Sequence, residues 1–546
     1  MKYWHTLRHL KPVQFHGRLT FRYLRPTPNL APAPALACAH GPWAAPTLRE
    51  PGLAGPGMFD LLGVQGALSL IGWDGPQRDK LWRYNQHYFD DLNAAGAARR
   101  HGWHVELIAD WVARNPAGAG NGWEPYPTSL RIVNWVKWLW AGNTLSPVAL
   151  QSLAVQARWL GGRLEWHLLG NHLFCNAKAL VFAGLAFQGP EADAWLARGL
   201  EIIDQQLPEQ VLADGGNFER SPMYHAIFLD DLLDLLNAAQ AGTVRIDAGR
   251  QAGWRHTAAR MLAWLAGMTH PDGGIALFND AALNIAPALA QLNAYAARLG
   301  MPAACAPPAA AGAPTCTRWA ESGYVRLDAG PASAFLDVAP VGPDYLPGHA
   351  HADTLSFELS LFGSRVIVNG GTSCYGLSAQ RSRERGTAAH STVLVEHTNS
   401  SEVWGGFRVA RRARAFDYAE QRHGGALTVA CSHDGYTRLP SKPVHRRAWT
   451  LGEGRLDVVD HVSGRCRSAQ ARYIFHPSVR LTQQAPSRWL LALDGGHSAT
   501  LELTQGVGRL ESAQYASHFG TVLATICLVA ELEQGSAALS IIWQSH

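Results

Sequence analysis

Hydrophobic residues recur at three- and four-residue spacing from about residue 60 to residue 300. The pattern runs through SLRIVNWVKWLWAG, NAKALVFAGLAFQG, DDLLDLLNAAQAG and RMLAWLAGMTH, with glycine and proline residues between the segments. This spacing places apolar side chains along one side of a helix. A series of helices of hairpin length therefore predicts an all-α array or toroid over residues 59–300.

The pattern changes after residues 301–317, MPAACAPPAAAGAPTCT, a Pro/Ala-rich stretch that predicts a linker. Beyond it, apolar and polar residues alternate in short segments such as YVRLDAG, TLSFELSLFG, SRVIVNGG and RLDVVDHV. Alternation with turn residues between the segments predicts an antiparallel β-sandwich over residues 318–546. The expected fold class is multidomain α+β, with the helical toroid first and the sandwich second.

Residues 1–58 are first basic and then rich in proline and alanine, and we expect irregular wrapping over 27–56. The opening stretch MKYWHTLRHLKPVQFHGRLTFRYLRPTP interleaves Lys and Arg with aromatics. This favours a basic helix docked on the domain over weak attachment to a membrane surface. The stretch lacks the apolar core of a secretory signal, so we expect a cytoplasmic protein, with the periplasm as the alternative.

Composition narrows the function classes. The chain has 546 residues, 47% of them hydrophobic, which predicts two or three globular domains. A formal net charge of +4 and 20 tryptophans suit an anionic carbohydrate partner, and no nucleic-acid-binding motif is present. No apolar run is long enough for a membrane span. The eight cysteines form no CxxC pair, which predicts reduced thiols, and the oligomeric state stays open.

Residues 347–360, PGHAHADTLSFELS, combine two histidines and an aspartate with an apolar strand. On a strand, His349, His351 and Asp353 would share one face at the strand's entrance. A single histidine there would be structural, whereas two beside an aspartate favour a functional site. His390 opens a later expected strand and could converge with His351 on a metal ion, since neutral imidazole is the commonest such ligand.

Two further stretches lie in the helical half. In LLGNHLFCNAKAL, Asn171 follows Gly170 before a helix, which is an N-cap position. In DGGNFERSPMYHAIFLDDLL, Ser221 is a natural N-cap and Pro222 takes the first helical position, which puts Tyr224 in the first turn. There the helix dipole would ease ionisation of a phenol whose pKa is ordinarily ~10. Taken singly, capping by Asn171 and packing by Tyr224 are the simpler explanations.

Together these stretches resemble the heparinase II/III group of polysaccharide lyases. The resemblance rests on GNHLFCNAKAL, DGGNFERSPMYH, PGHAHADTLSFELS and GTAAHST…SEVWGGFR in this order, with NGWEPYPTSLRIVNWVKW and YNQHYFDDL upstream, from about residue 80 to 415. It implies an (α/α) toroid joined to an antiparallel β-sandwich, with the active cleft between them. It also implies β-elimination on a uronic-acid-containing polysaccharide, either glycosaminoglycan-like or alginate.

The resemblance also implies roles for residues. Asn171, with His172, would neutralise the uronate carboxylate. Tyr224 would act as base and acid when both lie on one face of the sugar, and His349 would serve as base for the opposite configuration. The expected sugar contacts are Trp123, Arg131, Asn134, Glu219, Arg220, Trp404 and Arg408. One structural metal ion, most consistent with zinc, would be held by His351, Asn369 and His390.

The chain departs from the family pattern at two positions. Asn369 stands where the family has an aspartate ligand, and neutral asparagine is a poorer ligand for zinc. Cys175 stands where the family often has glutamate, which argues against heparin-type specificity but not against elimination.

Two other functions fit the same scaffold. A glycoside hydrolase would need two carboxylates, for which Asp214, Glu219, Asp230 and Asp231 are available near Tyr224. A non-catalytic protein that binds polysaccharide during its biosynthesis is the second alternative.

Overall fold

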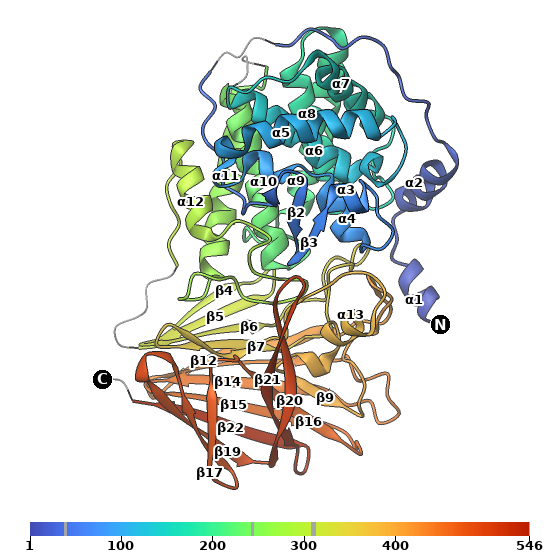
Figure 1. Cartoon of the computed structure of the whole chain (residues 1–546). Helices are drawn as coiled ribbons and strands as arrows, with labels where there is room; N and C mark the ends of the chain where they lie inside the picture. Colours follow the sequence, from blue (N-terminus) through green and yellow to red (C-terminus); the bar gives the residue numbers. More distant parts are fainter. Residues whose placement is uncertain (38–40, 242–244, 307–312, 545–546) are drawn as a thin grey trace.

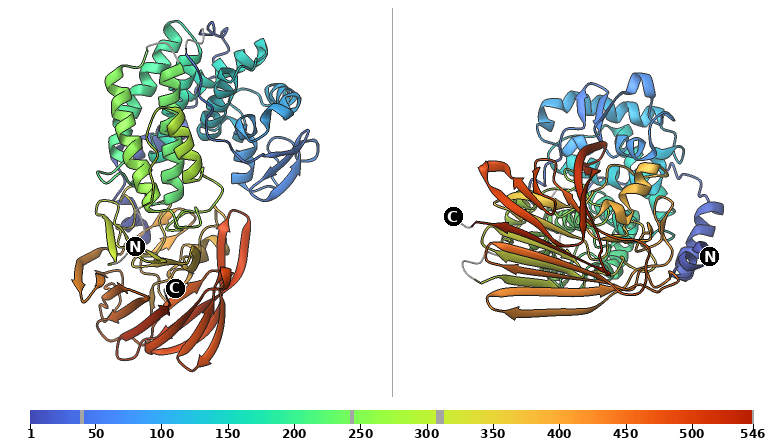
Figure 2. Two further views of the ribbon diagram at one scale, coloured as in Figure 1. Left: turned by 90° about the vertical axis from the view of Figure 1, so that its left-hand side faces the viewer. Right: turned by 90° about the horizontal axis from the view of Figure 1, so that it is seen from below.

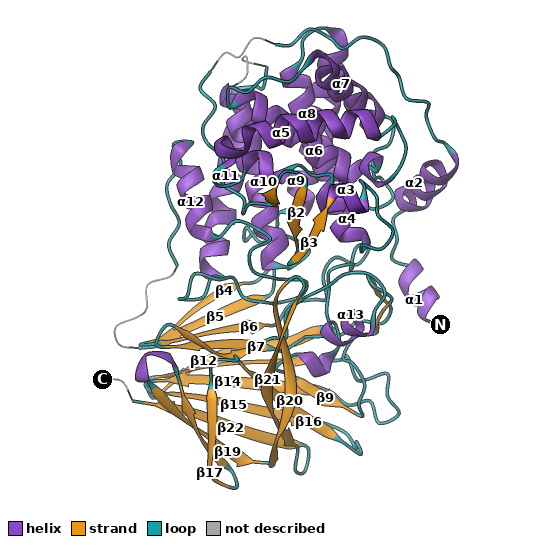
Figure 3. Cartoon of the chain, in the orientation of Figure 1, coloured by secondary structure: helices purple, strands orange, loops and turns teal. Residues whose placement is uncertain are grey.

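The computed structural model describes residues 1–37, 41–241, 245–306 and 313–544. A helical domain lies on one side of a layered β-domain, and the chain crosses from one to the other once after α12 (Figures 1 and 3). Within the described ranges, no helix has both the length and the apolar character needed to cross a lipid bilayer. Seven cysteines in these ranges are free thiols, and Cys38 lies outside the described residues.

The helical domain confirms the toroid predicted from the 3.6-residue period. Its helices, together with the two that precede it, are α1 Lys2–Leu7, α2 Pro12–Tyr23, α3 Leu68–Ile71, α4 Lys80–Gln86, α5 His101–Arg114, α6 Pro125–Trp140, α7 Pro147–Gly161, α8 Gly170–Ala186, α9 Pro190–Gln210, α10 Pro222–Ala241, α11 Ala248–Gly267 and α12 Leu289–Arg298. Polar side chains cap the starts of α7, α10 and α11, because Ser146, Ser221 and Asp247 accept hydrogen bonds from first-turn amides.

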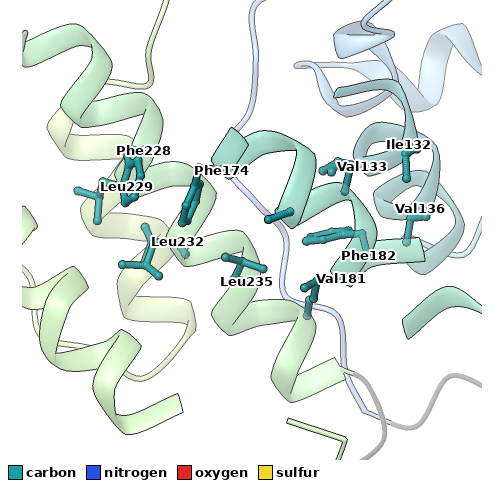
Figure 4. Packing of buried hydrophobic residues seen from close by; sticks show 14 of the residues in the cluster. Ile132, Val133, Val136, Phe174, Val181, Phe182, Phe228, Leu229, Leu232 and Leu235 are labelled. Carbon is teal, nitrogen blue, oxygen red and sulfur yellow. The ribbon is translucent and has the colours of Figure 1, made fainter. Parts of the chain in front are cut away.

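The core of the helical domain is built from α6, α8 and α10. Figure 4 shows Phe174 and Phe182 of α8 between side chains of α10 and of α6. The rings of Phe174 and Phe228 lie 4.1 Å apart, and Phe182 packs 5.2 Å from Trp140. Because α8 is apolar on nearly all sides, it forms the centre of the domain rather than its surface.

The β-domain consists of two antiparallel sheets whose facing sides share one apolar core. The first has the order β12-β13-β14-β15-β22-β19-β18-β17 and the second β20-β21-β16-β8-β7-β6-β5-β4, with β9 paired to β16. The bounds are β4 Thr315–Trp319, β5 Tyr324–Ala329, β6 Ala332–Asp337, β7 Phe357–Leu361, β8 Ser364–Val368, β9 Val393–Val395, β12 Ala415–His423, β13 Ala426–His433, β14 His445–Gly452, β15 Arg455–Val462, β16 Ala469–Phe475, β17 Arg480–Ala485, β18 Arg488–Ala492, β19 Ser498–Gln505, β20 Val507–His518, β21 Thr521–Glu531 and β22 Ser536–Trp543.

Smaller elements complete the β-domain. Helix α13 Ala379–Glu384 and the strand pair β10 Val403–Trp404 and β11 Arg408–Val409 lie in the long connection between β8 and β12. This connection faces the helical domain in Figure 1. It thus brings residues of the β-domain toward the starts of α8 and α10.

Two expectations about boundaries were wrong. A small sheet of β1 Leu53–Gly55, β2 Met58–Leu61 and β3 Val64–Ala67 lies across the expected boundary at residue 59, so the start of the expected helical region is strand instead. The tight turn between β2 and β3 places Leu62 and Gly63 at φ 54° and 73°, a conformation that ends helical periodicity. Strand β4 also begins inside the expected linker, of which residues 307–312 lie outside the described residues.

The basic N-terminal residues form the docked helix that we expected. Gln14 and Gly17 of α2 are buried, and a Cβ added at Gly17 would lie 2.8 Å from the backbone nitrogen of His167. Phe21 stacks 4.2 Å from the His167 ring. Glycine at position 17 therefore allows the helix to press directly against the helical domain.

We predict that Phe182→Ala lowers the free energy of unfolding of the helical domain by about 3–5 kcal/mol, because it leaves a cavity at a fully buried site. Urea denaturation followed by tryptophan fluorescence measures this loss. Val148→Ala, at an exposed apolar position, is the matched control and should change the value by less than about 0.5 kcal/mol. An equally small effect at Phe182 would contradict the packing shown in Figure 4.

Candidate active site

Asp280 is the centre of a buried polar cluster at the junction of the two domains. It follows α11 in the helical domain, and its carboxylate is fully buried. His349 Nδ1 lies 2.9 Å from one carboxylate oxygen, and His351 Nε2 lies 2.8 Å from the other. Arg381 of α13 donates two hydrogen bonds to the same carboxylate. One carboxylate therefore orients both histidines of the HAHAD stretch.

The charge of Asp280 is stabilised by these neighbours. Burial by itself would raise the pKa of the carboxyl, but the Arg381 guanidinium and the two histidines hold that pKa well below its usual range. Arg381 is held in turn by the Gly406 carbonyl at 3.1 Å. Asp280 is therefore an anion, and its hydrogen bond to Nδ1 leaves Nε2 of the His349 ring directed toward Glu219.

Tyr224 packs directly on His349. The two rings are stacked with their centroids 3.8 Å apart, and the Tyr224 hydroxyl lies 2.9 Å from the hydroxyl of Tyr375. Tyr224 lies in the first turn of α10, where its backbone amide donates to the Ser221 hydroxyl. The predicted cap and the predicted position of the phenol are both confirmed. Burial outweighs any help from the helix dipole and raises the pKa of Tyr224 far above its usual value, so the phenol is neutral.

Asn171 and His172 lie in the first turn of α8. The N-cap is Leu169 rather than Asn171, because Leu169 adopts the non-helical conformation, with φ 63°. No described residue forms a hydrogen bond with the Asn171 side chain, which is half-buried. The amide of Asn171 is therefore available to a ligand rather than used as a cap.

His172 is paired with a buried carboxylate. Its Nδ1 lies 3.1 Å from Glu165, and its ring packs on Tyr126. Burial opposes protonation of His172, but the Glu165 carboxylate outweighs it and raises the pKa of the imidazole. The start of α8 thus combines an amide donor with a histidine that favours its cationic form.

Glu219 lies between the α8 residues and His349. Its carboxylate is 3.6 Å from His349 Nε2 and has no hydrogen-bond partner among the described residues. Burial raises the pKa of Glu219, against the opposing effects of His349, His172 and the backbone amide of Asn171. The Glu219 carboxyl therefore lies between the start of α8 and His349 and connects the two segments.

The HAHAD stretch itself does not form a strand. Strand β7 begins only at Phe357, and Leu355 has φ 63°, so the simple alternation from His349 onward was wrong. The two histidine rings differ in exposure: the His349 side chain is 13% exposed, and His351 is fully buried. The loop therefore presents His349 to the cleft and His351 to the interior.

Four of the expected sugar contacts are structural instead: Trp123, Arg131, Asn134 and Arg220. All four are buried, and their polar groups already bond within the protein. The Arg131 guanidinium donates to Gln156 and lies 3.8 Å over the ring of Trp111. Asn134 donates to the Tyr88 carbonyl at 2.9 Å. These groups are committed to the fold and cannot reach a saccharide.

The Arg220 guanidinium donates to the Ser322 and Glu321 carbonyls, so it joins the helical domain to the β-domain. Trp404 and Arg408 lie at the junction on the strand pair β10–β11, with the exposed Arg408 guanidinium 4.8 Å over the Trp404 ring. The indole N–H of Trp404 donates to Thr6 and its ring packs 4.9 Å from Tyr3, so contact of Trp404 and Arg408 with a sugar stays a prediction.

Cys175 points into the helical domain. It is buried, and its thiol donates to Asp231 at 3.5 Å. Its side chain therefore does not line the cleft, and the family difference at this position does not act through a direct sugar contact.

A second cluster next to Asp280 has a donor set suited to a metal ion. His351, Asp353 and His390 are buried and each offer a ligand atom within 4.8 Å of the others. Neither ring nitrogen of His390 has a hydrogen-bond partner in the described structure, and nor does His351 Nδ1. Burial also holds the pKa of His390 well below its usual value, so the ring is neutral. Unsatisfied neutral imidazoles beside a carboxylate fit a zinc-type site.

The carboxylate of this cluster comes from Asp353 and not from position 369. Asn369 is buried, its amide donates to the Ser356 hydroxyl at 3.3 Å, and its oxygen accepts from the Ser391 amide at 3.4 Å. Asp353 is therefore a donor of this cluster that the prediction left out, and Asn369 as a ligand stays a prediction. The contact of Asn369 with Ser391 also supports the segment that carries His390.

Arg447 of β14 holds together the two segments that carry these residues. It donates to the carbonyls of Leu355 and Ser391 at 2.9 and 2.6 Å, and it is paired with Asp460. The cluster is therefore supported from the core of the β-sandwich.

Sequence reasoning missed Asp280, Tyr375 and Arg381. Asp280 stands in the stretch LFNDAALN, where Asn279 has φ 57° and no periodic pattern marks a functional side chain. Tyr375 and Arg381 lie in the β8–β12 connection, beyond any motif that we used. Only the turn-forming Asn-Asp pair after a buried apolar run could have drawn attention to Asp280.

Comparisons with known proteins agree with this architecture. The family description "Heparinase II/III N-terminus" matches residues 92–299, and "Heparinase II/III-like, C-terminal" matches residues 313–543. An (α/α) toroid followed by an antiparallel β-sandwich defines one class of polysaccharide lyase folds, and this chain has that fold. The chain belongs to the heparinase II/III family.

Two curated relatives are named heparin-sulfate lyase. The protein of Bacteroides stercoris is 26% identical over 253 residues, or 43% of this chain and 37% of the relative. The protein of Pedobacter heparinus is 24% identical over 320 residues, or 54% of this chain and 48% of the relative. The matched regions thus span less than half of each relative.

Two solved structures share the fold. A heparinase III structure has a TM-score of 0.67 at 15% identity, covering 98% of this chain and 85% of that one. A mutant of the heparan sulfate lyase HepC from Pedobacter heparinus has a TM-score of 0.60 at 18% identity, covering 86% and 78%. Both confirm the predicted order of toroid and sandwich.

We predict that Asp353→Asn and His390→Ala each remove bound zinc, because each deletes a donor of the cluster. Zinc at a hundred times its Kd should raise the free energy of unfolding of the unchanged protein by about 2.7 kcal/mol. Thermal denaturation with and without chelator, together with elemental analysis, measures this. His397→Ala, at an exposed histidine, is the control and should keep the metal response. No zinc response in the unchanged protein would contradict the site.

Proposed function

We propose that this protein is a lyase that cleaves a uronic-acid-containing polysaccharide by β-elimination. The observation that carries the proposal is the contact of Tyr224 with His349, which Asp280 holds in place. Glu219 connects this pair to the start of α8, since its carboxylate lies 3.6 Å from His349 Nε2 and beside the backbone amide of Asn171. The names of the two curated relatives make heparan sulfate the first substrate to test, within glycosaminoglycan-like chains and alginate. The partner is thus an anionic polysaccharide.

The reaction requires three functions at one sugar. A base removes the C5 proton of the uronate, and the electron pair of that C–H bond forms the C4–C5 double bond. The C4–O bond breaks with its electrons on oxygen, and an acid protonates that oxygen. The barrier is the weak acidity of C5–H beside a carboxylate, so that carboxylate must be neutralised as charge develops on it.

Asn171 and His172 provide this neutralisation. The amide donates a hydrogen bond, and His172, whose pKa is raised by Glu165, contributes positive charge. Each well-placed donor of this kind lowers the barrier by about 2.7–4 kcal/mol. The raised pKa of Glu219 lessens repulsion between its carboxyl and the bound uronate.

Tyr224 and His349 divide the proton transfers. The phenol of Tyr224 is neutral, since burial raises its pKa, so it carries the proton that the leaving oxygen requires. Asp280 accepts from His349 Nδ1, which leaves Nε2 as the base for the C5 proton. This assignment gives the base role to His349 and keeps Tyr224 as the acid.

A metal ion bound by His351, Asp353 and His390 would act structurally. It would supply positive charge that fixes the loop carrying His349 and leaves His351 Nε2 bonded to Asp280. The proton transfers themselves belong to Tyr224 and His349.

The hydrolase alternative lacks a second usable carboxylate. Asp214 bonds the Ser322 amide and hydroxyl, and Asp230 and Asp231 pair with Arg49 and Lys178. Glu219 is the one of these four without a partner in the described structure. A hydrolase needs two carboxylates that flank the bond.

We predict that Tyr224→Phe lowers kcat/KM on the cleaved polymer by roughly 10²–10⁴-fold, because the acid is lost while the ring still stacks on His349. Asn171→Ala should lower kcat/KM by roughly 10²–10³-fold. Formation of the unsaturated product is followed by its near-ultraviolet absorbance. Phe407→Leu is the control, because it removes an aromatic ring that packs beside His349 without removing a proton donor or acceptor. It should lower kcat/KM far less than Tyr224→Phe.

Each result has a distinct meaning. Cleavage of the polymer without formation of the ultraviolet chromophore would show that the protein is a glycoside hydrolase and not a lyase. If no uronate polymer is cleaved and Tyr224→Phe binds polymer like the unchanged protein, the binding protein is the correct function. If His349→Gln stays active while Tyr224→Phe does not, Tyr224 acts as both base and acid.

We predict that Glu165→Gln moves the alkaline limb of the pH–rate profile to lower pH. Burial lowers the pKa of His172 and Glu165 outweighs it, so the cation persists above its ordinary range and is lost as the pH rises through the raised pKa. Removing the Glu165 charge shifts that loss downward. The pH dependence of kcat/KM is the measurement.

Glu106→Gln, at an exposed carboxylate of α5, is the control and should leave the profile unchanged. An unmoved alkaline limb in Glu165→Gln would show that protonated His172 is not required for the reaction.

A further inference from the structure

Helix α2 has two contrasting faces. Its inner face, with Gln14, Gly17 and Phe21, packs on the body of the protein. Its outer face carries Phe15, Leu19 and Tyr23 at four-residue spacing, which places them along one line of the helix. Their exposed fractions are 45%, 60% and 71%. The outer face is therefore an apolar stripe without a partner among the described residues.

The neighbouring residues extend this apolar character. Tyr3, Trp4 and Leu7 of α1 and Leu24 after α2 are also exposed. Nine of the 25 exposed large apolar side chains in the described structure belong to residues 1–24. Such a concentration in so short a segment marks a binding surface rather than ordinary scatter.

The same segment is uniformly cationic. Residues 1–49 contain seven Lys or Arg residues and no Asp or Glu. Arg18 and Arg22 are exposed beside the apolar stripe, and neither forms an ion pair within the described structure. Lys11, by contrast, pairs with Glu209 of the body. The free positive charge lies next to the exposed apolar side chains.

We propose that residues 1–25 bind the surface of a bilayer that contains anionic phospholipids. Phe15, Leu19 and Tyr23 enter the boundary between headgroups and acyl chains, while Arg18 and Arg22 meet the phosphates. A helix with one apolar aromatic face and flanking cations lies in the plane of such an interface. Aliphatic Leu19 offers a saccharide no hydrogen bond, so the stripe favours lipid over polysaccharide.

The docking of α2 on the protein keeps its outer face exposed to solvent. Gly17 lies against the backbone of His167, and Gln14 bonds the Tyr345 carbonyl, so the inner face stays attached. Figure 1 and the right view of Figure 2 show the N-terminal helices at the outer edge of the molecule. Binding needs no release of the helix and no change in the junction of the domains.

Sedimentation of the full chain with vesicles tests the proposal. We expect binding to vesicles of equal parts phosphatidylglycerol and phosphatidylcholine, and none to pure phosphatidylcholine. Phe15→Gln with Leu19→Gln should weaken binding by about tenfold or more, because apolar burial is lost. Arg18→Gln with Arg22→Gln should weaken it by roughly fivefold for each charge removed. Circular dichroism verifies that both variants are folded.

The matched control is Leu70→Gln with Val148→Gln, two exposed apolar positions outside this segment. It should bind vesicles like the unchanged protein. Absence of binding to the anionic vesicles, or equal binding by the Phe15 and Leu19 variant, would overturn the proposal. If the stripe variant loses affinity for soluble heparan sulfate while vesicles never bind, the surface belongs to the polysaccharide instead.

Discussion

The buried carboxylate of Asp280 is the constraint on which the site depends. A charge removed from water must be matched by close partners, and here the partners are Arg381 and two histidines. Asp280 belongs to the helical domain, whereas all three partners come from the β-domain. The Asp280 carboxylate therefore joins the two domains. It also fixes the orientation of the His349 ring and positions His351 in the neighbouring donor cluster. Removing one partner of a buried pair typically costs about 3–5 kcal/mol, so this arrangement is maintained by stability as well as by chemistry.

The chemistry of the site is set by burial more than by the helix termini. Asn171 and Tyr224 both lie in first turns, where the dipole favours negative charge. The pKa of Tyr224 nevertheless rises, because desolvation of a buried phenolate is the larger effect. At His172 the effect of a neighbouring charge exceeds the effect of burial, since the Glu165 carboxylate lies within hydrogen-bonding distance of the ring. The two first turns therefore differ, because burial keeps the proton on the Tyr224 phenol, whereas the Glu165 carboxylate raises the pKa of the His172 imidazole against the effect of burial.

Local sequence patterns predicted much of the fold because the spacing of apolar residues follows the spacing of the side chains that are buried. The helices of the toroid and the strands of the sandwich each bury one regular row of side chains, and both were predicted. The β2–β3 hairpin was missed because its turn at Leu62 and Gly63 interrupts a sequence with helix-like apolar spacing. At the site, Tyr224 and His349 carried recognisable motifs, whereas Asp280 meets His349 across 69 residues and follows no periodic pattern. Asp353 joins His351 and His390 in the donor cluster, and only the folded loop shows that its side chain turns toward them.

The position of α1 and α2 has a mechanical consequence. Thr6 accepts a hydrogen bond from Trp404 of the β-domain, whereas Phe21 contacts His167 and Lys11 pairs with Glu209, both of the helical domain. The N-terminal arm is thus a second tether across a junction that the chain otherwise crosses only once. Two connections restrict rotation of one domain against the other more than a single connection does. We therefore expect α10 and the loop that carries His349 to keep nearly the same relative position when a ligand binds, which lowers the ordering cost of binding.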